Sequence, residues 1–150
     1  MSSTGVTVGG TLNSGNLGLR VHYDTGTKLL YSDSGVITNP VGPAQVGAFP
    51  SGVAVVTDST LKRAFVLTSS TSNISNNPGQ GATSYTLNIY DLNTLGLLNS
   101  IVIPDVLGYP TRMTRWGSNG LAFVTNSQVY TAGSAGVLYI LQGSGISGSP

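Results

Sequence analysis

Short apolar runs separated by turn-forming residues recur along the whole chain. Runs rich in Val, Ile, Leu, Tyr, Phe and Thr return about every 8 to 15 residues, and Gly, Asn, Asp, Ser and Pro lie between them. No segment keeps a helical period, and the 21 Gly residues would weaken any helix that they interrupted. The pattern therefore predicts an all-β protein with little or no helix.

The expected strands fall into groups of four. They are Gly5–Gly9, Leu19–Tyr23, Lys28–Ser32, Val36–Thr38, Gln45–Phe49, Val53–Thr57, Arg63–Thr68, Thr86–Tyr90, Leu97–Ile103, Arg112–Trp116, Leu121–Thr125 and Val137–Gln142. The first group ends at Phe49, the second runs from Val53 to Ile103, and a third of three strands runs from Arg112 to Gln142. Gly5–Gly9 is the candidate for its fourth strand. Because a propeller blade is a four-stranded antiparallel sheet, we predict about three propeller-like blades.

An internal echo supports repetition. The run Val21–Leu30 returns as Asn88–Leu97, and in each copy a strand ends in Tyr-Asp before a polar turn and a second apolar run. We interpret the echo as one repeated sheet-building unit. Asp24 and Asp91 are expected to fix turns, because an Asp side chain can accept hydrogen bonds from backbone N–H groups two residues on.

Three blades are too few to close a ring, because closed propellers usually have about four to eight. A second copy, or the missing blades of a longer chain, would have to complete it. The polar loop Ser69–Ser84 explains the long spacing of the echo and contains a glycosylation-type tripeptide at Asn73. We expect the domain to span 1–142 and a flexible Gly/Ser tail to follow at 143–150.

Composition disfavours several classes of function. The chain is 39% apolar but only 7% charged, with a net charge of +1, so it has few cations for nucleic acid. It has no Cys and no run of about 18 apolar residues that could span a membrane. The first residues lack the features of a signal peptide, so the chain is either cytoplasmic or a mature or excised segment. A hydroxyl-rich surface of low charge favours an extracellular or envelope location.

We predict no catalytic, cofactor or metal residues, and therefore no enzyme. His22 is the single His, no Gly-x-Ser-x-Gly motif is present, and Asp33 and Asp58 are isolated in the sequence. Asp and backbone or amide oxygens would suffice for calcium, but no Asp-x-Asp-x-Asp run is present. The Gly-x-Gly-x-x-Gly pattern at 143–148 lacks the following helix and acidic residue that dinucleotide binding needs.

The candidate binding residues lie in one short stretch: Tyr109, Arg112, Arg115 and Trp116. Arg and Trp are enriched at binding hot spots. Strand alternation places Arg115 on one face and Arg112 and Trp116 on the other. Since one face is expected to be core, at least one of these Arg residues should be paired.

Asn119-Gly120, just after this stretch, predicts a hairpin, because both residues tolerate the positive φ angles of a type I′ turn. The surrounding run Pro110–Thr125 contains Arg-Trp-Gly-x-Asn-Gly-Leu-Ala-Phe and follows a Gly-x-Pro-Thr turn that begins at Gly108. This run resembles a blade of bacterial, secreted YncE-like or WD40-like propeller proteins. Tyr31–Gly35 and Asp58–Phe65 look like the two preceding blades. The likeness covers about Leu19 to Gln142 and implies a propeller fold with an extracellular or envelope binding or structural role.

The function hypothesis that we favour is a non-catalytic structural or self-assembly module, whose partner is itself or the missing blades of a longer chain. Low charge and open strand edges support it, because unpaired edges invite strand addition. The alternative is a glycan- or protein-binding module, which Tyr, Trp and Arg near loops would favour. A propeller-type lyase or hydrolase has little support.

Overall fold

The protein is all-β in the computed structural model, which describes residues 11, 17–18, 20–69, 83–126 and 136–147. Within these residues, eleven strands form three antiparallel sheets, and one short helix follows them. The prediction of an all-β fold with little helix is confirmed. The three predicted strand groups are confirmed as well, because each sheet is built from one group.

Each sheet is a meander in which every strand pairs with its neighbour in sequence. Sheet A contains β1 (Val21–Asp24), β2 (Leu29–Ser32), β3 (Val36–Asn39) and β4 (Ala44–Ala48). Sheet B contains β5 (Ala54–Asp58), β6 (Arg63–Ser69), β7 (Thr83–Asp91) and β8 (Leu97–Val106). Sheet C contains β9 (Tyr109–Trp116), β10 (Gly120–Asn126) and β11 (Leu138–Gln142).

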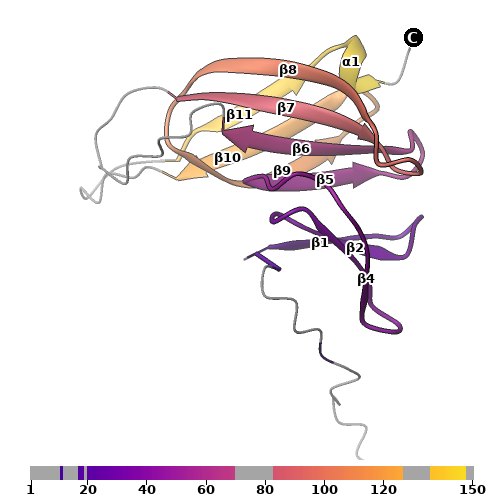
Figure 1. Ribbon diagram of the computed structural model, residues 1–150. Coiled ribbons are helices and arrows are strands. Elements are labelled where there is room, and N and C mark those ends of the chain that lie inside the picture. The colour runs from indigo at the N-terminus through magenta and orange to yellow at the C-terminus, as the bar shows by residue number, and fades with distance from the viewer. Residues whose placement is uncertain (1–10, 12–16, 19, 70–82, 127–135, 148–150) are drawn as a thin grey trace, which may run out of the picture.

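Sheet B lies between the other two sheets (Figure 1). One of its faces packs against sheet A through Ala64, Val66 and Tyr90, and the opposite face packs against sheet C through Phe65 and Leu67. Because both faces are covered, β6 carries four consecutive buried residues where a strand with one covered face would alternate. The apolar run of β6 is therefore the local sequence signature of the central sheet.

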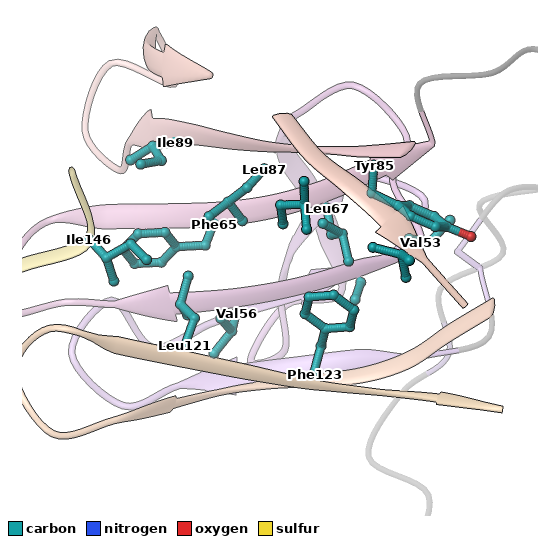
Figure 2. Close-up of a cluster of buried hydrophobic side chains, with 13 residues drawn as sticks. Val53, Val56, Phe65, Leu67, Tyr85, Leu87, Ile89, Leu121, Phe123 and Ile146 are labelled. Atoms are coloured by element: carbon teal, nitrogen blue, oxygen red, sulfur yellow. The ribbon is translucent and has the colours of Figure 1, made fainter. Parts of the chain in front are cut away.

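The larger core lies between sheets B and C and contains 13 buried residues. Figure 2 shows Val56, Phe65 and Leu67 from sheet B facing Leu121 and Phe123 from sheet C. Phe123 also stacks on Tyr139 of β11, with ring centroids 4.9 Å apart. The smaller core, between sheets A and B, contains six buried residues: Tyr31, Ile37, Phe49, Ala64, Val66 and Tyr90.

One type of Asp-based hairpin turn occurs three times, starting at Asp24, Asp58 and Asp91. In each, Oδ1 of the Asp accepts a hydrogen bond from the amide three residues further on, at 2.7, 3.0 and 2.8 Å. The residue after that amide has a positive φ of 61°, 53° and 58°, respectively. The predicted turn-fixing role of Asp24 and Asp91 is confirmed, and Asp58 plays the same role.

The Tyr-Asp echo repeats this hairpin and does not repeat a whole sheet. Asp24 ends β1, the first strand of sheet A, whereas Asp91 ends β7, the third strand of sheet B. The position in sheet B that matches Asp24 is Asp58, which ends the first strand, β5. Interpreting the echo as a repeated sheet unit was therefore wrong, because the same turn chemistry serves both hairpins of a sheet.

The β9–β10 hairpin forms where Asn-Gly predicts it, but not with a type I′ turn. Positive φ falls on Gly117, at 55°, and not on Asn119 or Gly120. Gly120 instead begins β10 and pairs with Trp116. A Cβ at Gly120 would lie 2.3 Å from the Trp116 ring, so a side chain at that position requires the indole to move.

The helix α1 (Ser144–Ser147) packs beyond Gln142, where composition places the end of the domain. Its Ile146 is buried in the core between sheets B and C, and Arg63 Nη1 donates a hydrogen bond to the Gly145 carbonyl at 3.0 Å. The packed part of the chain therefore extends through this turn. The expected strand Gly5–Gly9, residues 70–82 of the predicted loop and the last three residues lie outside the described residues.

Candidate interaction surfaces

The four predicted binding residues all belong to β9, but they do not form one site. Arg115 and Tyr109 lie on the face of sheet C that packs toward sheet B, whereas Arg112 and Trp116 lie on the opposite face. Alternation along the strand separates Arg115 from Arg112 and Trp116, as predicted. Tyr109 lies beyond a register shift in the β9–β10 pairing, and its packing against the core places it. A single cluster of all four residues is therefore absent.

Arg115 ties sheet C to sheet B. Its Nε and Nη2 atoms contact Oδ2 of Asp58 at 3.0 and 2.9 Å, and its guanidinium lies 5.2 Å from the centroid of the Phe65 ring. Its Nη1 and Nη2 atoms also donate to the carbonyls of Gly120 and Ser118, each at 3.0 Å. The expectation that at least one Arg is paired is confirmed. Arg115 is held by internal contacts and is a structural residue.

Tyr109 is half-buried and packs against the core between sheets B and C. It lies close enough to Tyr85 to affect that residue's ionisation: burial, with a contribution from Tyr109, raises the pKa of Tyr85 to about 12. Tyr85 therefore stays neutral at physiological pH. Tyr109 contributes to this packing from the inward side of β9.

Arg112 and Trp116 belong to an exposed apolar surface that we call the outward face of sheet C. The strand register places Arg112, Val124 and Leu138 in one row and Ile140 in the next, while Trp116 lies beside Gly120. All five side chains are exposed, including three large aliphatic ones. Neighbouring exposed apolar side chains of this kind are typical of a protein–protein contact site.

A second exposed apolar surface lies at the other end of the molecule, on the outward face of sheet A. Tyr23 and Leu30 are register partners there, while His22 and Tyr31 are partners on the face toward sheet B. The surface contains a hollow of about 270 Å³. Its lining residues are mostly apolar: Leu17, Val21, Leu30, Ser32, Val36, Thr38, Pro40 and Pro43. Sequence reasoning missed this site, because its residues come from separate strands and loops and form no motif.

A polar network joins sheets A and B at the ends of β1 and β5. Thr57 Oγ1 donates to Asp24 Oδ2 at 2.6 Å and lies 2.9 Å from His22 Nε2. Because the single hydroxyl proton goes to the carboxylate, Nε2 of His22 must carry the proton of the second bond. In a Ser-His-Asp triad the His lies between the other two groups, whereas here the Thr does. The network is therefore a structural link and not a nucleophilic triad.

The ionisation of the network follows from its burial and its hydrogen bonds. Burial lowers the pKa of His22, although Asp24 partly opposes the shift. Burial alone would raise the pKa of Asp24, but hydrogen bonds from Thr57 and Thr27 outweigh it and lower the pKa. At neutral pH the network thus contains a neutral imidazole and a carboxylate.

The described carboxylates do not gather into a metal site. No group of three or more His, Cys, Asp or Glu residues that could hold an ion occurs among them. Asp33 lies 3.5 Å from Arg20 and Asp58 pairs with Arg115, while Asp24 and Asp91 fix turns. Four of the five Asp residues are therefore engaged by protein groups.

Comparisons with protein-family models, curated proteins and solved structures found no match to this chain. The resemblance to YncE-like or WD40-like propellers remains a prediction from motifs. Among the described residues, no helix is long and apolar enough to cross a membrane.

Proposed function

We propose that the chain is a non-catalytic structural module of propeller-like blades that associates with copies of itself, outside the cell or in its envelope. One observation carries the proposal. In the described part of the chain, sheet B has both faces covered, whereas exposed apolar side chains such as Tyr23 and Trp116 lie on the outward faces of sheets A and C. Covering such faces is favourable, at roughly 25 cal/mol for each Å² of apolar surface removed from water.

The arrangement of the first strands supports the propeller-like part of the proposal. β5 contacts both β1 and β9. The C-terminal ends of these strands lie together, because Asp24 bonds to Thr57 and Asp58 bonds to Arg115. β1, β5 and β9, the first strands of the three sheets, thus run side by side in the same direction. Adjacent blades of a propeller place their innermost strands around a central channel in this way.

Association would supply the sheets that a ring needs. Two copies together contain six sheets, within the range of about four to eight blades that closed propellers usually have. The two outward faces differ from each other, so a contact between them is head-to-tail and produces either a closed ring or a filament. The missing blades of a longer chain would cover the same faces.

Mass measurement in solution tests the proposal. Sedimentation velocity over a wide range of protein concentrations should show a discrete dimer or larger assemblies, and the mass should rise with concentration. A chain that stays monomeric at every concentration would contradict self-association. The envelope location is tested separately, by fractionating cells that produce the protein.

A binding module for another molecule is the second candidate, and the hollow on sheet A favours it. Its apolar lining suits an apolar side chain of a protein partner better than a glycan, which would need more polar groups. Calorimetric titration with candidate proteins, together with a glycan array, tests this function. Glycan binding that Trp116→Ala abolishes would instead favour a glycan site on sheet C.

A further inference from the structure

The two internal junctions repeat one link at matching positions. At the junction between sheets A and B, the Asp that ends β1 accepts a hydrogen bond from Thr57, the penultimate residue of β5. At the junction between sheets B and C, the Asp that ends β5 pairs with Arg115, the penultimate residue of β9. In the first strand of a sheet, the last residue therefore faces the following sheet. The penultimate residue of that strand faces the preceding sheet.

The same rule identifies two residues that have no counterpart among the residues that the structure describes. The last residue of β9, on the outward face of sheet C, is Trp116. The penultimate residue of β1, on the outward face of sheet A, is Tyr23. Both are large aromatic side chains, and they are 41% and 47% exposed, respectively. The polar pair of the internal junctions is thus replaced at the open ends by one aromatic residue on each side.

The N-terminal ends of β9 and β1 also match, because each lies beside exposed apolar side chains. On sheet C, Val124 and Leu138 share the row of Arg112, toward the start of β9 and away from Trp116. On sheet A, Val21, the first residue of β1, lines the hollow. The hollow is therefore at the N-terminal end of β1, away from the turn that follows Asp24. If sheet C of one copy met sheet A of the next as sheets B and C meet, Val124 and Leu138, with Arg112 in the same row, would lie toward the hollow while Trp116 lay beside Tyr23.

We infer that a second copy of this chain covers the outward face of sheet C, and that Trp116 packs against Tyr23 of that copy. The inference rests on the proposed function and specifies its contact. A second copy is the occupant because the contact continues the series of junctions from A to B and from B to C. An aromatic pair suits a contact that forms in solution, since it buries a large area without removing a charge from water.

The single tryptophan of the chain reports directly on this contact. As protein concentration rises, Trp116 emission should shift to shorter wavelength in parallel with the mass measured by sedimentation. Trp116→Ser and Tyr23→Ser should each weaken association by about tenfold or more, as expected for residues at the centre of an interface. Leu98→Ser is the matched control, because Leu98 is an exposed apolar residue on sheet B and its replacement should leave association unchanged.

A rescue experiment tests the pairing itself. Trp116→Asp alone should weaken association, whereas the double variant Trp116→Asp/Tyr23→Arg should regain it by rebuilding the Asp–Arg link of the internal junction. If the double variant stays as weak as the single one, the pairing of these positions is wrong. Circular dichroism of each variant checks that the sheets are retained.

The remaining outcomes separate this inference from the proposed function. A chain that associates while Trp116 emission and the effect of Trp116→Ser both stay unchanged would overturn the inference and leave self-association standing. A chain that is monomeric at all concentrations would overturn both. A shift in emission that Tyr23→Ser abolishes supports both.

Discussion

The two junctions of sheet B are built with different chemistry. The junction with sheet C buries 13 residues, mostly aliphatic and aromatic, and has an ion pair at its edge. The junction with sheet A buries six, and at the same relative position it has a hydrogen-bonded network of Asp24, Thr57 and His22. Both junctions thus place a polar link at matching strand positions, but the junction with sheet C buries more apolar side chains.

This difference indicates where the molecule opens first. Stability differs across a protein, and regions with fewer buried apolar contacts open at lower free energy. Sheet A has short strands of four or five residues and shares the smaller core with sheet B, so it should separate from sheet B before sheets B and C separate. The predictions below test this order.

Phe123→Ala should give the largest loss of stability. Its ring is 1% exposed, lies in the larger core and stacks on Tyr139, so its removal leaves a cavity. We expect the free energy of unfolding to fall by about 3–5 kcal/mol. Phe49→Ala, in the smaller core, should cost less. Urea denaturation followed by circular dichroism measures both, and equal losses would contradict the proposed difference between the junctions.

Arg115→Met should have the next largest effect. The side chains of Arg115 and Asp58 are 12% and 19% exposed, so the substitution leaves a mostly buried carboxylate without its partner. We expect a loss of about 2–3 kcal/mol, reduced from the cost of a fully buried pair by the remaining exposure. Arg112→Met is the matched control, because Arg112 is exposed on the same strand and its replacement should change unfolding little. A similar loss in both variants would remove the special role of Arg115.

Much of the fold could be predicted from the sequence because its signals are local. Turn residues separate short apolar runs, and each of the three strand groups became one sheet. The consecutive apolar residues of β6 are also present in the sequence, although the sequence analysis did not use them to identify the central sheet.

The candidate site was harder to predict because its chemistry depends on contacts between distant residues. The Asp24–Thr57 and Asp58–Arg115 bonds join positions 33 and 57 residues apart. Alternation correctly separated Arg115 from Trp116, but only the packing of sheet C on sheet B decides which of them is inward. Asp ends both β1 and β5, but Asp58 follows Thr57 and lacks the preceding Tyr that makes the segments at Asp24 and Asp91 alike.

Asp24→Asn should weaken the junction between sheets A and B. The carboxylate accepts bonds from Thr57 and from the amide and hydroxyl of Thr27, and an amide side chain accepts fewer. We expect a loss of about 1–2 kcal/mol. Asp91→Asn is the matched control, since Asp91 fixes the same type of turn in an exposed hairpin and should lose less. Hydrogen exchange should show faster opening of sheet A in Asp24→Asn alone, and equal changes in both variants would mean that only the turn matters.

The pH dependence of the same junction should give the smallest effect. Burial holds the pKa of His22 below its ordinary value of 6.5, so the unfolded chain binds this proton more tightly than the folded one. The resulting stabilisation is fully present above pH 6.5 and is lost as pH falls through the lower folded value. The lowered pKa of Asp24 acts only in a more acidic range, below its ordinary value of 3.8, so the two contributions separate.

Urea titrations at a series of pH values measure this effect. The free energy of unfolding should fall, with sheet A loosening first, as pH drops below 6.5, and His22→Asn should remove this dependence on pH. A slope that persists in His22→Asn would assign the pH sensitivity to another group and leave the polar network without this role.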